Sequence, residues 1–287
     1  MDAKIIAIAV IAVVAIGGCA AFFVLNNNND SKDSQYDLLD STDNIKKGMK
    51  MELSGTIGDM KLETTHEVKS VSNGKVSYTE TTKIIGAPMY DAYQLDSFSP
   101  ESFEEMFGFD YTSDTIPQGV NVKHDGNNYT ITGKYDTLYG MHYVYDLTIT
   151  YDGTNVTMVS GSLESKMTSE SGTMTTTLHL GTSSGKLTIT FDSVTTKDDD
   201  CDVKDFYTEG NFGYDPDDYK KCKITEKSGT FEGKSVTIYT ITGETEEKEI
   251  YDGVNVYVYK GTILKQEGKV TMQKIEYNAS VKLTITA

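Results

Sequence analysis

Part of this chain repeats itself. Residues 151–163 read YDGTNVTMVSGSL, and residues 251–263 read YDGVNVYVYKGTI, so one order of residues returns later in the sequence. A second match, YTITG, stands upstream of each copy, at residues 129–133 and 239–243. Two ordered matches indicate an internal duplication, which predicts two tandem repeats of about 100–110 residues.

Apolar and polar residues alternate from about residue 49 onward, as in strands with one buried face. Pairs of residues that suit tight hairpins with positive φ separate the alternating segments. These pairs are Asn73-Gly74, Asp125-Gly126, Asp152-Gly153, Ser184-Gly185, Glu232-Gly233 and Asp252-Gly253. The sequence therefore predicts an all-β fold of antiparallel sheets. In the repeated stretch, Val156 and Met158 are expected to point inward, and Asn155 and Thr157 outward.

One short helix is expected in each repeat. Ser99-Pro100-Glu101 and Asp215-Pro216-Asp217 both place an N-cap residue before a proline at the first helical position. A third group of similar stretches begins at Gly55, Gly161 and Gly261. The unit that opens each repeat therefore occurs once more near the end of the chain. This favours one shared sheet, with a first repeat over residues 48–160 and a second over residues 161–287 that includes a closing strand unit.

Residues 5–25 form an unbroken run of uncharged, almost wholly apolar residues. As a helix this run would be about 31 Å long, enough to cross a hydrocarbon core of about 30 Å. We therefore expect residues 1–25 to be a signal anchor that crosses the cell membrane once, residues 26–47 to be a polar stalk, and the remainder to be extracytoplasmic. Two alternatives stay open, namely lipidation at Cys19 and cleavage of a signal peptide near it.

The segment KIIAIAVIAVVAIGGCAAFFVLNNNN, residues 4–29, resembles the N-terminal anchor of uncharacterised surface proteins from host-associated methanogenic archaea. The resemblance is confined to this segment of the 287-residue chain. It implies a location at the cell surface and carries no activity.

Charge excludes some classes of partner. The chain has 43 Asp and Glu against 26 basic residues, a net charge of −17, and every basic residue is Lys. Such a field repels nucleic acid, so no nucleic-acid partner is expected. Without Arg, the chain also lacks the side chain best suited to bind phosphate or carboxylate groups in a bidentate manner.

Cys201 and Cys222 flank the second expected helix. Outside the cytoplasm, two cysteines in one loop usually bond, so we predict a disulfide between them. On the chain-entropy model, this closed loop stabilises the fold by about 3 kcal/mol. The alternative is a pair of reduced, partly buried thiols.

The acidic loop around Cys201 is a candidate calcium site, because calcium prefers several carboxylate oxygens. The candidate ligands are Asp198, Asp200, Asp202 and Asp205. The ligand order of an EF-hand is missing, so a solvated acidic loop is the alternative. No other cofactor is expected.

No catalytic motif lies in a suitable context, and we expect no enzyme. The GTSSG stretch at residues 181–185 has strands on both sides, which predicts a hairpin rather than a nucleophile elbow. The four histidines lack the short spacing of a zinc site. They are His66, His124, His142 and His179.

Four sequons for N-glycosylation are present, at Asn29, Asn128, Asn155 and Asn278. Asn155 is the strongest candidate of the four, because it lies on the outward side of its strand, which we expect to be exposed to solvent.

Between the YTITG and YDG matches, the first repeat has KYDTLYGMHYVYDLTIT where the second has ETEEKEI. We expect a surface extension that can be replaced at little cost. Aromatic side chains with polar tips suit contacts with sugars, peptides or partner surfaces. The candidate binding residues are Tyr135, Tyr139, Met141, His142, Tyr143 and Tyr145. The alternative is a longer hairpin whose tyrosines cover the sheet.

These features favour a non-enzymatic surface protein with a structural role or one in binding or adhesion, whose partner is an unidentified surface protein or glycan. The alternative is a carrier of a hydrophobic ligand or lipid, similar to the half-barrel lipoprotein carriers of the bacterial envelope. A carrier needs an apolar cavity of several hundred Å³, of the order of 300–1,000 Å³, whereas a binding module should have a filled core.

Overall fold

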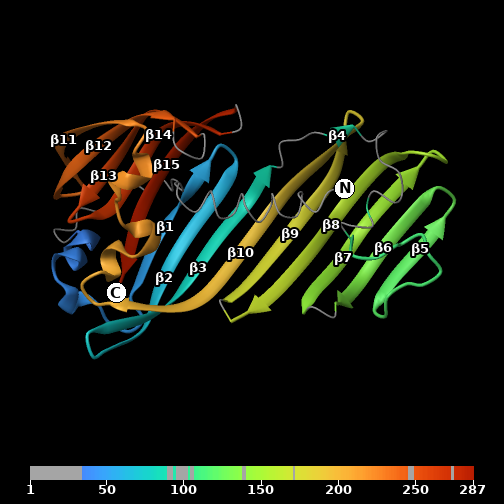
Figure 1. The fold of residues 1–287 in the computed structure, drawn as a ribbon, viewed down its shortest axis with the longest axis horizontal. Coiled ribbons are helices and arrows are strands. Elements are labelled where there is room, and N and C mark those ends of the chain that lie inside the picture. The colour runs from blue at the N-terminus through green and yellow to red at the C-terminus, as the bar shows by residue number, and fades with distance from the viewer. Residues whose placement is uncertain are drawn as a thin grey trace. The chain divides into compact units, whose positions relative to one another are not determined.

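The computed structural model describes residues 34–88, 93–94, 103, 107–137, 140–170, 172–244, 249–272 and 275–287. Over these residues the fold is antiparallel β, as the alternation predicts (Figure 1). The strands follow the order β11-β12-β13-β14-β15-β1-β2-β3-β10-β9-β8-β7-β6-β5, and the short β4 pairs with β10. The described residues divide into two compact units, residues 84–195 (unit 1) and residues 34–83 with 196–287 (unit 2).

Unit 1 is a series of hairpins that follow one another along the chain. Its strands are β4 (Tyr93–Gln94), β5 (Val120–Asp125), β6 (Asn128–Asp136), β7 (Met141–Tyr151), β8 (Val156–Ser169) and β9 (Gly172–Ser183), with parts of β3 (Lys75–Pro88) and β10 (Lys186–Asp202). Every second residue of β7 is buried, from Tyr145 through Leu147 to Ile149. Phe107 and Tyr111 belong to the same apolar cluster, which is the core of unit 1.

Unit 2 contains the first and the last strands of the described chain. Its strands are β1 (Lys50–Ile57), β2 (Met60–Ser72), β11 (Lys223–Phe231), β12 (Lys234–Glu244), β13 (Ile250–Tyr259), β14 (Thr262–Met272) and β15 (Ile275–Thr286). Its 3-10 helices are η1 (Gln35–Asp40), η2 (Thr42–Asn44), η5 (Phe206–Thr208), η6 (Gly210–Phe212) and η7 (Pro216–Tyr219). Lys50 of β1 pairs with Thr286 of β15, and the ladder continues to Ile57 opposite Ala279.

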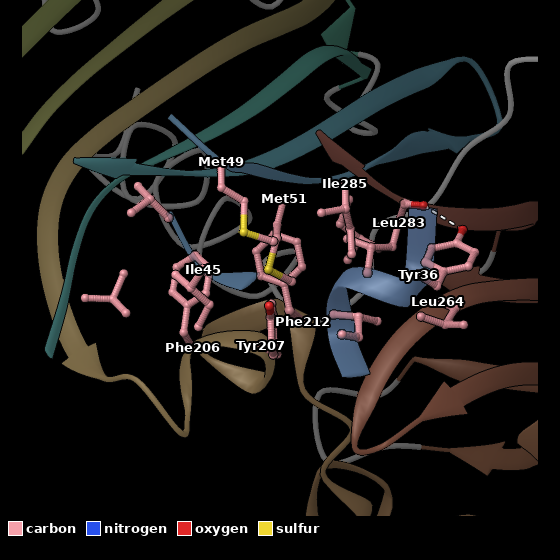
Figure 2. Packing of buried hydrophobic residues seen from close by; sticks show 14 of the residues in the cluster. Tyr36, Ile45, Met49, Met51, Phe206, Tyr207, Phe212, Leu264, Leu283 and Ile285 are labelled. Atoms are coloured by element: carbon pink, nitrogen blue, oxygen red, sulfur yellow. Dashed lines mark hydrogen bonds between the residues drawn. The ribbon is translucent and has the colours of Figure 1, made fainter. Parts of the chain in front are cut away.

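The core of unit 2 is filled by side chains from its short helices (Figure 2). Tyr36 of η1, Phe206 of η5 and Phe212 of η6 are all fully buried among residues of the strands. The hydroxyl of Tyr36 donates a 2.8 Å hydrogen bond to the carbonyl oxygen of Leu283 in β15. Residues 34–47, which the sequence analysis assigned to a polar stalk, therefore include side chains of the core.

Most of the expected turns are present. Asn73, Ser184 and Glu232 have positive φ angles of 52°, 51° and 44°, and each lies between consecutive strands of a hairpin. Asp252-Gly253 differs, because it lies inside β13, where the register shifts between Asp252 and Asn255. This pair forms a bulge in place of the expected hairpin, and the chain turns instead at Lys260, whose φ is 50°.

The internal duplication is not confirmed by the strand pairing. In the first copy, YTITG lies in β6, which pairs with β7, and YDG lies at the end of β7 and in the turn after it. In the second copy, YTITG lies in β12 and pairs with β13, which itself contains YDG. The matched stretches thus occupy different positions, because a short Gly-containing stretch can form either a turn or a bulge.

The residues of the repeated stretch that point inward are only partly those expected from the sequence. Val156 is 1% exposed and faces inward as expected, but Met158 is 41% exposed. A register shift between Thr150 and Tyr151 rotates the alternation, so that Val159 is buried instead.

The second expected helix begins as the sequence indicates, but as the 3-10 helix η7. The side chain of Asp215 accepts a 2.8 Å hydrogen bond from the amide of Asp217, and Pro216 stands at the first position. The first expected helix lies largely outside the described residues, and so does the apolar run at residues 5–25. Within the described ranges, no helix combines the length and the apolar character needed to cross a membrane.

Candidate functional site

Uncharged side chains form two adjacent rows across strands β6 to β9 of unit 1. Met141, Met167 and Met174 stand directly opposite one another on β7, β8 and β9. Tyr135 of β6 stands opposite Tyr143 of β7, two residues along from the methionine row. We call these five residues the Tyr–Met shelf.

The shelf continues the core face of the sheet. Because side chains of a strand alternate between its faces, Tyr143 and Met141 lie on the same face as the buried Tyr145. The same alternation places Met167 on the face of Leu163, which is 3% exposed. The face is therefore buried at Tyr145 and Leu163 and becomes accessible at the shelf, where Met167 is 41% exposed and the other four members are half-buried.

Neighbouring aromatic rings hold the tyrosines of the shelf in place. The ring of Tyr143 stacks on that of Tyr145 with 6.0 Å between centroids, and Tyr135 meets Phe109 edge-on at 6.4 Å. Burial, together with the nearby Tyr135, raises the pKa of Tyr143. Its hydroxyl therefore stays protonated at neutral pH and can donate a hydrogen bond to a ligand.

The opposite face of the same strands carries the charges. His142 stands opposite Lys166 on β8, and Nδ1 of His142 lies 2.5 Å from a carboxylate oxygen of Asp136. Glu164 faces the same way as Lys166. Charged groups are thus separated from the shelf by the pleat of the sheet.

The structure divides the six binding residues expected from the sequence. Tyr135, Met141 and Tyr143 lie together on the shelf, whereas His142 lies on the opposite face. Tyr145 belongs to the core, since it is 2% exposed and its hydroxyl donates a 2.6 Å hydrogen bond to the carbonyl oxygen of Phe107. Tyr139 lies outside the described residues.

Sequence reasoning missed Met167 and Met174. Met167 stands four residues after Leu163, and this even spacing places both side chains on one face once β8 is known to run without interruption from Val156 to Ser169. The signal was obscured by the expected equivalence of Gly161 and Gly261, because only Gly261 lies in a hairpin turn between strands.

Strand β7 contains residues 141–150, which belong to the segment 134–150 that the sequence analysis treated as a replaceable extension. It pairs with β6 on one side and with β8 on the other, and it supplies Tyr145, Leu147 and Ile149 to the core. Part of the segment is therefore a central strand.

The acidic stretch around Cys201 lies along β10 and forms ion pairs with lysines. Nζ of Lys69 lies 2.5 Å from Asp198, and Nζ of Lys75 lies 3.2 Å from Asp202 and 3.7 Å from Asp200. The hydrogen bond from Lys69 lowers the pKa of Asp198. Across the parts of the chain that are described, no group of three or more His, Cys, Asp or Glu side chains is arranged to hold a metal ion. Calcium binding here, which would also include Asp205, stays a prediction.

The two cysteines of unit 2 are free thiols in this structure. Cys201 is buried in the core cluster, and burial raises the pKa of its thiol to about 11. Cys222 lies against Gly243 of β12, where an added Cβ atom would be 3.6 Å from its sulfur. The disulfide between them stays a prediction.

His66 is the one fully buried histidine of the described chain. Its Nε2 lies 3.3 Å from a carboxylate oxygen of Glu80, its Nδ1 has no hydrogen-bond partner, and its ring lies 4.4 Å from that of Tyr78 and 4.6 Å from that of Phe212. The hydrogen bond from His66 lowers the pKa of Glu80, and the charge of Lys197 adds to this effect. A ring without exposed surface does not contact a substrate, which favours a structural role.

The expected hairpin at residues 181–185 is present between β9 and β10. Among the sequons, Asn128 and Asn278 are exposed and Asn155 is half-buried beside the turn after β7. Asn29 lies outside the described residues. Glycosylation of these sites stays a prediction.

No family model matches this chain, and comparisons with curated proteins and with solved structures yield no match either.

Proposed function

We propose that this chain is a membrane-anchored, extracytoplasmic, non-enzymatic protein that binds a partner through the Tyr–Met shelf. One observation carries the proposal: five uncharged side chains form a continuous, accessible extension of the core face of unit 1. Tyrosine and methionine are both enriched where proteins meet their partners. An accessible surface of this composition favours binding rather than solvation alone.

The proposed location depends on the N-terminal segment. The apolar run at residues 5–25 is long enough to cross a membrane, and its resemblance to anchors of surface proteins supports the same location. The first described residues after it are tied into unit 2 through Tyr36, whose hydroxyl is bonded to Leu283. A retained anchor at residues 5–25 would therefore be followed, from residue 34 onward, by a folded unit.

The carrier alternative has less support. A carrier needs an apolar cavity for its ligand. In unit 2, the aromatic side chains of Tyr36, Phe206 and Phe212 pack among the residues of the strands and contribute to a filled core (Figure 2). This packing favours the binding module.

The test compares two methionines of β8. Met167 and Met158 have the same exposure, 41%, but Met158 lies on the face opposite the shelf. The full chain, reconstituted in nanodiscs, is screened against arrays of extracytoplasmic proteins and of glycans. We expect Met167→Lys to lose the array signals of the wild type and Met158→Lys to retain them.

Both variants place a lysine on an accessible position of the same strand, so effects of charge and of stability are matched. If Met167→Lys retains every signal while it melts as the wild type does, the shelf does not carry recognition and the proposal fails.

A further inference from the structure

The hairpin between β2 and β3 turns at Asn73-Gly74, the one Asn-Gly pair in the sequence. The φ angles of the two residues are 52° and 75°, as a type I′ hairpin turn requires. Both residues are exposed, and a Cβ atom added at Gly74 would have no other atom within 4 Å. Across the described residues, no turn or loop hydrogen bond is donated by the amide of Gly74. The amide is therefore accessible to the side chain of Asn73.

An exposed Asn that precedes Gly can lose its side-chain amide without an enzyme, because Gly allows close approach of the backbone. The amide nitrogen of Gly74 attacks Cγ of Asn73, its proton passes through water to the departing amide group, and ammonia leaves. The product is a cyclic succinimide. Water then opens the ring at one of its two carbonyl carbons, and position 73 becomes aspartate or isoaspartate. The sequence of steps consumes one water and releases one ammonia, with no oxidant or reductant.

The other asparagines of the described chain lack this combination. Asn127 is exposed in the turn between β5 and β6, but it is followed by Asn128, whose side chain hinders the attacking amide. Asn121 and Asn278 lie inside β5 and β15, where pairing with neighbouring strands holds the backbone. Reaction is therefore expected at Asn73 before the others.

The turn is also attached to the chain that follows β10. The carbonyl oxygen of Gly74 accepts a 2.9 Å hydrogen bond from the amide of Val203. Beside it, Nζ of Lys75 lies 3.2 Å from a carboxylate oxygen of Asp202. Val203 begins the connection that carries Phe206 of η5 into the core of unit 2. A change in the backbone of the hairpin therefore reaches a segment that fills this core.

We propose that Asn73 is a site of spontaneous deamidation, and that the isoaspartate formed there breaks the hydrogen bond between Gly74 and Val203. In isoaspartate the main chain runs through the former side chain and is one carbon longer. Because the length of a hairpin loop fixes how its strands meet, the longer loop displaces the carbonyl of Gly74. The new carboxylate also adds a negative charge next to Lys75, which already pairs with Asp202.

The test ages the full chain in nanodiscs at pH 8 in water enriched in heavy oxygen, and maps the peptides by mass spectrometry. We expect aspartate and isoaspartate at position 73, with heavy oxygen in the new carboxylate, while Asn127 keeps its amide over the same interval. The heavy oxygen distinguishes reaction during ageing from reaction during digestion. The same chain unfolded in urea provides the reference for an unrestrained Asn-Gly pair.

Hydrogen exchange then measures the hydrogen bond of Val203. In aged wild type, the amide of Val203 should lose the protection that it has in fresh protein. Asn73→Gly suits the same turn and cannot deamidate, so it should keep this protection with age. Fresh Asn73→Asp has the added charge but an ordinary backbone, and it should also keep the protection. Loss confined to aged wild type assigns the effect to isoaspartate.

Two results would overturn the site: an unchanged Asn73 in the folded chain while the urea-unfolded chain reacts there, or equal conversion of Asn127. If isoaspartate forms at position 73 and Val203 stays protected, the proposed break of the hydrogen bond is wrong. Equal loss of protection in fresh Asn73→Asp would contradict the role of the longer backbone.

Discussion

Nζ of Lys234 in β12 lies 2.7 Å from Oδ2 of Asp40 at the end of η1, although 194 positions separate them in the chain. Lys234 also contacts Asp37 at 2.6 Å, and Tyr259 and Lys260 both donate hydrogen bonds to Asp40. This network fixes the first described helix to the C-terminal strands of unit 2.

Asp40→Asn should destabilise unit 2 by about 1 kcal/mol at neutral pH, a value reduced because the Asp40 side chain is partly exposed. The hydrogen bond from Lys234, followed by those from Tyr259 and Lys260, holds the pKa of Asp40 well below its usual range. A lowered pKa means that this stabilisation is present above about pH 4 and is lost as pH falls toward the folded-state pKa. Urea unfolding at pH 7 and pH 3 should show that the difference in unfolding free energy between variant and wild type shrinks in acid.

Asp43→Asn, at an exposed neighbouring residue, serves as the control. An equal loss of stability in that variant would contradict a specific role of Asp40.

His66→Ala should lower the free energy of unfolding by about 2–4 kcal/mol, because it leaves a cavity among aromatic rings and removes a partner of Glu80. His66→Phe should cost less, since it keeps a ring between Tyr78 and Phe212 and Lys197 remains beside Glu80. Urea denaturation monitored by tyrosine fluorescence measures both. Equal losses in the two variants would show that the contact with Glu80, rather than packing, dominates.

Replacing residues 134–150 with ETEEKEI should abolish the folding of unit 1. The replacement removes most of β7, including Tyr145, Leu147 and Ile149 of the core. In contrast, Met141→Thr should keep the cooperative thermal transition, because Met141 is half-buried at the shelf. Differential scanning calorimetry distinguishes the two, and a chimera that still melts cooperatively would show that β7 is dispensable.

The predicted disulfide can be decided by alkylation before and after reduction. If Cys201 and Cys222 bond in the native protein, neither is labelled until a reductant is added, and unreduced peptide mapping finds them joined. If they are free, Cys222 should be labelled before Cys201 at pH 8, because burial raises the pKa of Cys201 to about 11 and hides its thiol.

The proposed topology predicts that protease added to intact cells removes residues 34–287. The prediction follows from the apolar run at residues 5–25 and the polar region beyond it. Solubilised protein, treated in parallel, controls for intrinsic resistance. Protection in intact cells together with cleavage after lysis would contradict an extracytoplasmic location.

Alternation and turn chemistry predicted the strands well, because they are local properties of the chain. Asn73-Gly74 and Ser184-Gly185 form the expected hairpins, and Val156 is buried as expected. Asp252-Gly253 failed because a bulge and a turn use similar residues, and only pairing with a neighbouring strand decides between them.

The candidate site could be predicted in part. Tyr135, Met141 and Tyr143 were found because they lie in one stretch of sequence, but the stretch also contains Tyr145, which is buried. Met167 and Met174 join the shelf through strand register, a property that depends on two hairpins and cannot be seen in either strand alone.

The pairing of β1 with β15 sets the order in which the chain can finish folding. Unit 1 is one continuous stretch of sequence, so it can close as soon as residue 195 has been made. Unit 2 has to wait for its last strand, because the partner of Lys50 is Thr286. Until residues 275–286 emerge, one edge of β1 has no strand to pair with along its 8 residues. During synthesis, this edge is the surface that a chaperone would have to shield from other nascent chains.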